Sequence, residues 1–461
     1  MNPRYATPLG ALLLVLLASA PASAATCTWK GGAGAWQTPS AWSCNAVPGS
    51  GDDVVVGSGA VTFSAPAVGS GAVTVRSLTL TGGTLDGDGT VTVTESLVWE
   101  AGTMAGSGST IVLGTAEFRD AVSKNVARTV YLRGASTWSN GTLQFRDGGV
   151  LVNEGSFTDD AAGTHSIARA GSFTAEPVVL NRGTWTVASV GTSANVAFVN
   201  AGTLRVAGAG FRLNAPGRFE NADGGTLVGD RLLDLASGPA VQLGGRTQPG
   251  GAGVVGAFPV EGPVPMAATH VLDVDLAGPG AHDQLVTSRG AVAVDGRLLV
   301  RVGSAAAVGA AFPVLVHTGP DPLTGCYEPD EIDVRGPGGV TPAPYAVAVT
   351  CSASGVQIAV SRMDTAGEDG PDGASASLAL AGPNPFAGRT ALALTAPAAG
   401  RATVEAFDAL GRRVAVLFEG AVAPGQPVPV AFEAGALPVG LYVVRAAGEG
   451  FALARTVTLA R

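Results

Sequence analysis

Charged, aromatic and lysine residues are scarce in this sequence. Of its 461 residues 14% are charged and 6% are aromatic, and lysine occurs only as Lys30 and Lys124. The net charge of −9 and the lack of a basic patch interleaved with aromatic residues disfavour a nucleic acid partner. Beyond the N-terminal segment, no stretch approaches the roughly 18 consecutive apolar residues of a membrane-spanning helix. We therefore expect no transmembrane helix in the mature chain.

The motifs of common catalytic and cofactor sites are missing as well. There is no HExxH motif, no P-loop, no dinucleotide fingerprint, and no GxSxG elbow in a strand–turn–helix context. The four cysteines show no CxxC spacing and have no nearby histidine cluster, which argues against a zinc site. These absences predict a protein without a metal, without a cofactor and without enzymatic activity.

Glycine is abundant, and eight of the 67 glycines open copies of one recurring phrase between residues 54 and 245. The phrase is Gly, then Thr or Ser, then a large apolar residue. Several copies lie 19 residues apart or close to twice that, while others lie 12 to 16 apart. An Asn often precedes it, at Asn140, Asn153, Asn181 and Asn200. The copies are Gly83–Leu85, Gly102–Met104, Gly141–Leu143, Gly155–Phe157, Gly171–Phe173, Gly183–Trp185, Gly202–Leu204 and Gly225–Leu227.

Short apolar segments at this spacing predict a parallel β-helix over residues 54–245, with inward apolar side chains stacked from coil to coil. Gly and Asn tolerate the left-handed backbone of tight corners, so we expect them at the corners. Because coils lie about 4.8 Å apart, roughly ten coils would form a rod on the order of 45 to 50 Å long. Each open end of the rod should be capped.

Residues 25–53 are the candidate N-terminal cap. Trp29, Trp36 and Trp42 precede a Pro-Gly-Asp turn, and this segment resembles the opening of bacterial surface β-helices. We expect the tryptophans to cover the first coil. A platform for glycan contact is the alternative.

Residues 246–360 are the candidate C-terminal β-helix region and cap. The succession of His270–Leu276, His282–Val286 and Gly296–Val300 resembles the closing region of autotransporter-like β-helices. Residues 361–377 are polar, rich in Gly and Asp, and lack an apolar period, so they predict a linker.

A few acidic residues and histidines are the candidates for catalysis. Some β-helices cleave polysaccharides, and that chemistry requires clustered carboxylates. Asp273 and Asp275 share one face of a predicted strand, and His282–Asp283 follows on a nearby loop. Ordinary exposed polar residues would give the same pattern. Structural roles are expected for Asp52–Asp53 in the cap turn, for Asp159–Asp160 as a turn followed by the lone His165, and for His317 at a strand end.

Residues 378–461 contain short runs of alternating apolar and polar residues divided by turn residues. In Arg401–Phe407 the alternation is strict, as in a half-buried strand. About six or seven such strands in roughly eighty residues predict a small Ig-like antiparallel β-sandwich. The other main runs are Arg412–Phe418, Val428–Phe432, Leu441–Arg445 and Ala454–Leu459.

The turns of this block carry more specific motifs, at Asn384, Pro385, Phe386, Asp408, Gly411, Arg412, Gly440 and Tyr442. In order and spacing they resemble the type A C-terminal sorting domain of the bacterial type IX secretion system. The family often has Ser at Val439 and Lys at Arg455 and Arg461. The resemblance implies recognition by secretion and sorting machinery, export across the outer membrane, and then removal of the domain or surface attachment. An ordinary Ig-like module is the alternative.

The N-terminal residues 1–24 also predict export. Arg4, an apolar run over Leu9–Ala18 and Ala22-Ser23-Ala24 form the pattern of a cleaved signal peptide. An exported chain passes through an oxidising compartment, which makes disulfides plausible. Four cysteines allow three pairings, and the local one keeps each bridge within one predicted module. It joins Cys27 to Cys44 and Cys326 to Cys351.

These expectations combine into an all-β protein: a parallel β-helix followed by a small sandwich, secreted or attached to the outer-membrane surface. The favoured function is a structural or adhesive stalk that contacts glycans, extracellular matrix or other cells. A polysaccharide-active lyase or glycoside hydrolase and a passive surface-layer component are the alternatives.

Overall fold

The computed structural model describes residues 24–461 except 65–70, 147, 164, 239, 252, 279, 304–308, 337–344, 363–375, 409–410, 450 and 461. The predicted signal peptide, apart from Ala24, and most of the predicted linker therefore lie outside the described residues. The chain divides into two compact units. One consists of residues 1–339 and 347–359, and the other of residues 340–346 and 360–461. Each unit is described by itself.

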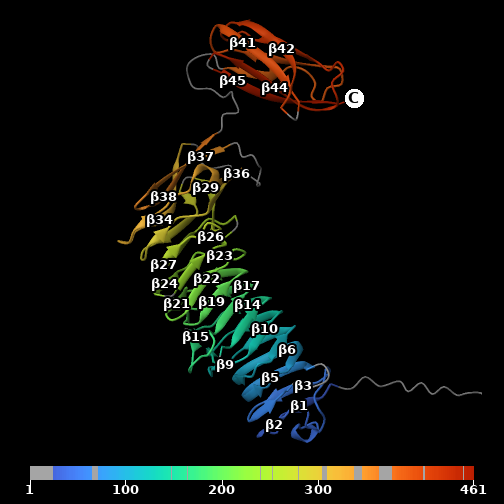
Figure 1. Ribbon diagram of the computed structural model, residues 1–461, viewed down its shortest axis with the longest axis vertical. Helices are drawn as coiled ribbons and strands as arrows, with labels where there is room; N and C mark the ends of the chain where they lie inside the picture. The colour runs from blue at the N-terminus through green and yellow to red at the C-terminus, as the bar shows by residue number, and fades with distance from the viewer. Residues whose placement is uncertain are drawn as a thin grey trace, which may run out of the picture. The chain divides into compact units, whose positions relative to one another are not determined.

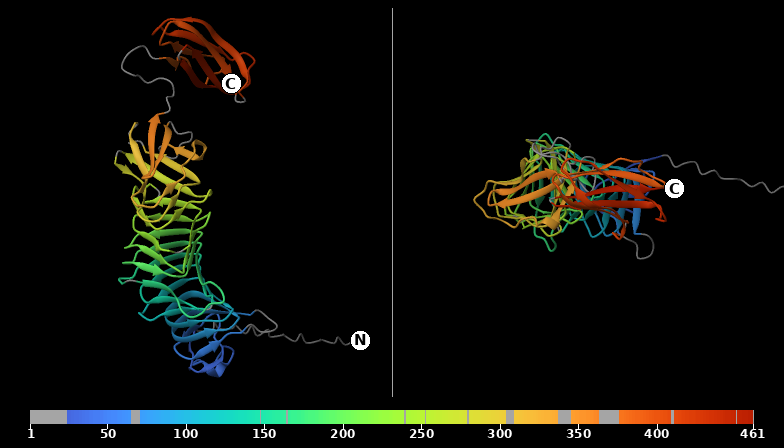
Figure 2. Two further views of the ribbon diagram at one scale, coloured as in Figure 1. Left: turned by 60° about the vertical axis from the view of Figure 1, so that its left-hand side comes forward. Right: turned by 90° about the horizontal axis from the view of Figure 1, so that it is seen from above.

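The first unit is a parallel β-solenoid of about 11 turns, which confirms the predicted fold class. Figures 1 and 2 show its coils stacked in chain order. Pairing between successive coils is parallel and forms three faces, named A, B and C. Two long strands, β5 (Ala72–Asp86) and β6 (Thr90–Met104), each cross all three faces, and most later coils use one short strand for each face.

The strands of face A include those that carry four of the eight copies of the glycine phrase. They are β1 (Thr26–Thr28), β3 (Asp53–Val56), β8 (Thr115–Phe118), β11 (Ala135–Trp138), β14 (Ser156–Asp159), β17 (Thr184–Val187), β20 (Thr203–Val206), β23 (Thr226–Gly229), β26 (Arg246–Pro249), β29 (Val271–Gly278), β33 (Arg297–Val302) and β36 (Ile332–Arg335).

Faces B and C complete each coil. Face B consists of β2 (Ala33–Ala35), β4 (Ala60–Thr62), β9 (Lys124–Val126), β12 (Thr142–Phe145), β15 (His165–Arg169), β18 (Thr192–Ala194), β21 (Phe211–Asn214), β24 (Leu233–Ser237), β27 (Ala257–Glu261), β31 (Gln284–Thr287) and β34 (Ala311–His317). Face C consists of β7 (Ser109–Val112), β10 (Thr129–Leu132), β13 (Val150–Asn153), β16 (Val178–Asn181), β19 (Ala197–Asn200), β22 (Arg218–Asn221), β25 (Ala240–Leu243), β28 (Val264–Pro265), β32 (Val292–Ala293) and β35 (Leu323–Thr324).

The register explains why the phrase has a loose period. The copies that begin at Gly155, Gly183, Gly202 and Gly225 lead into face A, whereas those that begin at Gly83, Gly102 and Gly141 lie on face B. The short spacings therefore arise where the phrase moves from one face to another. The copy Gly171–Phe173 is an exception, because it lies between strands β15 and β16.

Glycine is required at the entry to face A because backbone packs directly on backbone there. A Cβ added at Gly183 would lie 1.9 Å from the carbonyl oxygen of Gly155, and one at Gly202 would lie 2.1 Å from that of Gly183. The large apolar residue that follows points inward, and Phe157, Trp185 and Leu204 stack in successive coils. The glycine of the phrase thus allows the backbones of two coils to approach closely, and the apolar residue that follows fills a position in the core.

The asparagines have a role that differs from the predicted one. Asn153, Asn181, Asn200 and Asn221 are the last residues of successive face C strands, fully buried and in register. Each of the first three donates its side-chain N–H to the amide oxygen of the next, at 2.7 Å. None has a positive φ, so they form a ladder and are not left-handed corner residues. Asn140 lies outside this ladder, on an exposed corner.

Parallel pairing does not stop at residue 245 but continues on face A through β26, β29 and β33 to β36. Beyond the parallel coils, β38 (Gly355–Arg362) pairs antiparallel with β34 and so ends face B. The remaining short elements are β30 (Ala281–His282), β37 (Tyr345–Ser352) and the 3-10 helices η1 (Pro39–Ala41) and η2 (Pro329–Glu331).

The second unit has two antiparallel sheets, as predicted. One is β39 (Ser377–Leu380), β40 (Arg389–Thr395) and β43 (Val428–Glu433); the other is β42 (Arg413–Val422), β41 (Gly400–Phe407), β44 (Gly440–Gly448) and β45 (Phe451–Leu459). Apolar residues from both sheets form one core, which includes Leu392, Val404, Phe432, Val444 and Val457. We call residues 378–461 the sandwich.

Candidate functional site

The tryptophans of the N-terminal cap are packed inside it. Trp36 and Trp42 are fully buried and Trp29 is 4% exposed. The ring of Trp42 meets those of Trp29 and Trp36 edge-on at 5.0 and 4.9 Å, and its Nε1 donates to the Trp36 carbonyl oxygen at 2.8 Å. A sugar-binding platform needs an exposed ring face, and these rings offer none. Their packing supports the covering role and not the glycan contact.

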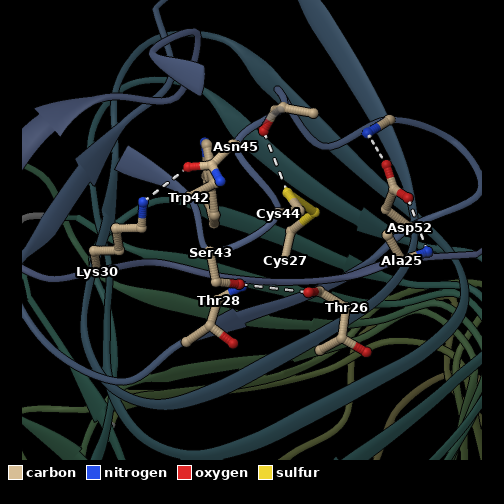
Figure 3. Close-up of a disulfide and its surroundings, with 12 residues drawn as sticks. Ala25, Thr26, Cys27, Thr28, Lys30, Trp42, Ser43, Cys44, Asn45 and Asp52 are labelled. Atoms are coloured by element: carbon tan, nitrogen blue, oxygen red, sulfur yellow. Dashed lines mark hydrogen bonds between the residues drawn. A yellow bond between two sulfur atoms is a disulfide. The ribbon is translucent and has the colours of Figure 1, made fainter. Parts of the chain in front are cut away.

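Two disulfides close the ends of the solenoid unit, with the predicted local pairing. Cys27 is bonded to Cys44, as Figure 3 shows, and Cys326 to Cys351. Beside the first bridge, the carboxylate of Asp52 accepts the backbone N–H groups of Ala25 and Gly49 at 3.1 and 2.9 Å. Asp52 therefore binds backbone, as its place in the turn predicted.

The carboxylates near the C-terminal end of the solenoid are occupied by structural contacts. Asp273 is fully buried as a side chain, and its Oδ2 accepts from Arg246, Gln248 and Arg301. Asp283 accepts the backbone N–H of Gly256 at 2.8 Å and of Asp275 at 2.9 Å. The hydrogen bond from the Asp275 N–H holds Asp283 against strand β29, so the structure does bring Asp275 and Asp283 together.

Burial changes the acid–base properties of this group. It raises the pKa of Asp283 to about 7, against the opposing effect of the two backbone hydrogen bonds. Burial also lowers the pKa of His282, whose ring lies edge-on to Phe312 at 5.4 Å. The pKa of the Asp283 carboxyl group thus lies near neutrality, while both of its oxygens accept backbone hydrogen bonds. Within the described residues, no group of three or more His, Cys, Asp or Glu side chains is placed to hold a metal ion.

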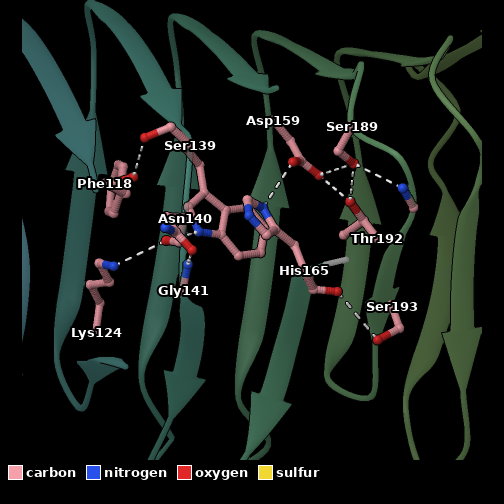
Figure 4. A network of polar contacts seen from close by, with 12 residues as sticks. Phe118, Lys124, Ser139, Asn140, Gly141, Asp159, His165, Ser189, Thr192 and Ser193 are labelled. Atoms are coloured by element: carbon pink, nitrogen blue, oxygen red, sulfur yellow. Dashed lines mark hydrogen bonds and ion pairs between the residues drawn. The ribbon is translucent and has the colours of Figure 1, made fainter. Parts of the chain in front are cut away.

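The Asp159–His165 segment differs from its prediction. Asp159 is not a turn residue: it ends β14, is fully buried, and occupies an inward row between Trp138 and Val187. His165 is not alone, since its Nδ1 lies 3.1 Å from Asp159 Oδ1. The hydroxyls of Ser189 and Thr192 donate to Asp159 Oδ2 (Figure 4). A carboxylate in the core is thus held by an imidazole and two hydroxyls.

A pocket of about 300 Å³ lies beside this network, where the corners of four successive coils meet face B. Its inner wall includes His165, Thr192 and Phe211, which stack in register and are at most 4% exposed. Its outer wall includes Ser193, Arg212 and Asp234, the next register row. Nε of Arg212 donates to Asp234 at 2.6 Å. The sequence could not reveal these residues as a group, because only the register aligns them.

The motif residues of the sandwich hold its turns and its last strand. The Oδ1 atom of Asn384 accepts the Thr458 N–H at 2.7 Å, and the buried Phe386 exchanges backbone bonds with Thr458 and Ala460. The peptide bond from Asn384 to Pro385 is cis. The motif therefore fastens the start of the sandwich to β45.

The other motif residues act within single turns. Asp408 accepts both the backbone N–H and the Nε of Arg412, at 3.0 and 2.8 Å. Gly411 and Gly440 have φ of 75° and 154°, in the region that favours glycine. The Tyr442 hydroxyl donates to the carbonyl oxygen of Pro438 at 2.6 Å. Each motif residue thus has a local conformational role.

No helix in the described part of the chain is long and apolar enough to cross a membrane. No protein-family model, no curated protein and no solved structure matches this chain.

Proposed function

We propose that this protein is an exported bacterial stalk, a structural and adhesive β-solenoid that its C-terminal sandwich directs to the cell surface or the medium. The observation that carries the proposal is the uninterrupted in-register stack from β1 to β36 on face A. A continuous parallel stack suits a rod that holds a surface away from its anchor, because each coil is bound along its whole length to its neighbours.

The interior of the stack supports a mechanical role. Three side-chain hydrogen bonds link the four ladder asparagines, and of their amide groups only the Oδ1 of Asn153, at the start of the ladder, lacks a partner among the described residues. Each disulfide is expected to stabilise its loop by roughly 3 kcal/mol on the chain-entropy account. Disulfides persist in oxidising compartments, so the two bridges also support export.

The resemblance of residues 378–461 to type IX sorting domains supports the route of export. The motif residues that carry the resemblance fix the turns of an independent apolar core. A sorting signal that must be recognised as a folded unit needs such a core. The proposed partner of the sandwich is accordingly the secretion and sorting machinery.

Export is tested in a bacterium that has a type IX secretion system. The full chain should reach the surface or the medium, and a chain without residues 378–461 should stay in the periplasm. A fusion of residues 361–461 to a periplasmic reporter should be exported. A truncated chain that still leaves the cell, or a reporter that stays in the periplasm, would refute the sorting role.

Adhesion is tested by applying the full-length mature protein to a glycan and polysaccharide array. Saturable binding without newly released reducing ends is the expected result. The absence of binding to glycans and to extracellular matrix proteins would leave a passive layer component as the better description.

Polysaccharide cleavage is a second candidate function, and the raised pKa of Asp283, about 7, is the observation that favours it. A carboxyl group with such a pKa can act as a general acid near neutral pH. Both of its oxygens already accept backbone hydrogen bonds, which favours a structural role. Release of reducing ends by the wild type, lost in Asp283→Asn, would establish the enzyme in place of the adhesin.

A further inference from the structure

We propose that the face B pocket beside Arg212 and Asp234 binds a single neutral sugar residue of an extracellular glycan. The proposal rests on the adhesive function above and assigns it a site. The pocket is distant in sequence from the tryptophans of the cap, and it needs no exposed aromatic platform. Four coils contribute to it, so the site exists only in the folded solenoid.

The inner wall of the pocket is held in place by the buried network. Asp159 accepts hydrogen bonds from Thr192 and Ser189 and contacts His165, and both Thr192 and His165 line the pocket. The Ser189 hydroxyl also lies 2.9 Å from that of Thr192. Side chains locked in this way cannot collapse into the space, so the pocket is formed before a ligand arrives.

Small corner residues keep the entrance of the pocket open. Gly191 and Gly210 line it, and a Cβ added at Gly191 would meet no atom within 4 Å. Val190, next to Gly191 in the sequence, is 53% exposed. A pocket lined by both apolar side chains, such as Phe211 and Leu232, and polar ones suits a ring that has hydroxyl groups on its edge and C–H groups on its face.

The outer wall supplies the donors and acceptors that hydroxyl groups need. Arg212 uses Nε to bind Asp234, and within the described residues its two terminal nitrogens have no hydrogen-bond partner. They are donors, and the carboxylate of Asp234 and the hydroxyl of Ser193 are acceptors in the same register row. A donor and an acceptor fixed side by side match two neighbouring hydroxyls.

The charge and the volume of the pocket restrict the class of ligand further. The charges of Arg212 and Asp234 cancel across a contact of 2.6 Å, which favours a neutral sugar over a uronate. A volume of about 300 Å³ is at the lower end of the range for ligand pockets, roughly 300 to 1,000 Å³. The pocket therefore has room for one sugar residue, such as the end of a chain, and not for an extended polysaccharide.

The test is saturation-transfer NMR on the full-length mature protein with glucose, galactose, N-acetylglucosamine and galacturonate as probes. At least one neutral sugar should bind the wild type. Arg212→Ala should weaken that binding at least tenfold, and Ser193→Trp, which fills the pocket, should abolish it. The matched control is Arg182→Ala, since Arg182 is 54% exposed and bound to Glu154 much as Arg212, 59% exposed, is bound to Asp234.

Folding is checked for each variant by tryptophan fluorescence. Arg212→Ala removes a side chain that is 59% exposed, and its buried partner Asp234 keeps the hydrogen bond from the Ala236 N–H, so the unfolding temperature should stay within about 4 °C of the wild type. Sugar binding that survives both Arg212→Ala and Ser193→Trp overturns the pocket assignment while the adhesive function stands. A preference for galacturonate overturns the neutral class. No binding of any probe by the wild type overturns the proposal itself, and the export assay remains unaffected.

Discussion

The solenoid and the sandwich treat buried polar groups in opposite ways. The solenoid buries four ladder asparagines, Asp159, His165, Lys124, Arg128 and further polar side chains, whereas in the described part of the sandwich the one buried polar side chain is Thr390. The reason lies in the symmetry of the two folds. In a stack of coils, each position recurs about 4.8 Å away in the next coil, so a buried polar side chain can meet its own counterpart.

The two facing sheets of the sandwich have no such repeat. A polar group placed between them would face unrelated side chains, and its desolvation would not be offset. Lys124 is an example of a buried charge that the solenoid accommodates. Its ammonium group donates to the carbonyl oxygens of Asp120, Val122 and Asn140, and burial lowers its pKa to about 8. Stacked corners supply those carbonyls together.

All six tryptophans and all four histidines of the chain lie between residues 29 and 317, and none lies in the sandwich. Tryptophan fluorescence therefore reports the solenoid alone, and the ring NMR signals of Tyr442, the one tyrosine of the sandwich and buried in its core, give the sandwich a separate probe. The comparison between the two regions can be tested within one molecule.

The largest effect is expected for Asn181→Leu, which interrupts the ladder at its centre. It leaves Asn153, Asn200 and the Thr203 carbonyl each without one partner, so we expect the solenoid to lose about 4 kcal/mol of unfolding free energy. The measurement is denaturant unfolding followed by tryptophan fluorescence. The matched change in the sandwich is Thr390→Val, which removes one hydrogen bond to Pro383 and should cost about 1 kcal/mol. Equal costs would contradict the comparison.

Gly202→Ala should cost the solenoid about 3 kcal/mol, because the new Cβ would collide with the backbone oxygen of Gly183. Gly388→Ala is its control in the sandwich, where an added Cβ meets no atom within 4 Å. The control should change stability by no more than about 0.5 kcal/mol. A tolerated alanine at residue 202 would show that coils can separate locally, against the close-approach argument.

The replacement of Cys27 and Cys44 by serine should lower the stability of the solenoid by no more than about 3 kcal/mol. The bridge closes a loop between residues 17 positions apart and lies in the cap. Tryptophan fluorescence should detect the loss directly, since three of the six rings are in that cap. An unchanged midpoint would mean that the tryptophan packing alone holds the cap.

Acid should destabilise the solenoid and leave the sandwich less affected. Burial lowers the pKa of His270 from 6.5 to about 4, so the unfolded chain binds the proton more readily between these values. The stability contributed by the neutral imidazole is complete above about pH 6.5 and is lost as pH falls toward 4, roughly 3 kcal/mol in all. His270→Gln should flatten this part of the solenoid's pH profile. A profile as steep as that of the wild type would remove His270 as its cause.

The sequence predicted the sandwich more closely than the solenoid. The run Arg401–Phe407 became β41 (Gly400–Phe407), and Val428–Phe432 became β43 (Val428–Glu433). Alternation and turn residues are local signals, and antiparallel neighbours joined by short turns leave little freedom of register. The fold class of the solenoid was equally visible in the glycine phrase.

The register of the solenoid could not be predicted from the sequence. Parallel partners are about 20 residues apart, and copies of the glycine phrase lie on two different faces. For this reason the sequence predicts neither the ladder position of Asn221 nor the buried pairing of Asp159 with His165. The pocket was beyond prediction for the same reason, since Ser193, Arg212 and Asp234 meet only after three coils have been aligned. Secretion, sorting and adhesion stay predictions that the experiments above address.

The cap at the first coil also gives the stack a direction. Its tryptophans and its disulfide close one end, and face A then grows coil by coil from β3 to β36. A newly arriving coil finds a row of unpaired N–H and C=O groups already aligned on the coil before it. The N-terminal cap can thus act as a template, so that a chain emerging with its N-terminus first assembles as a zipper closing from a fixed end.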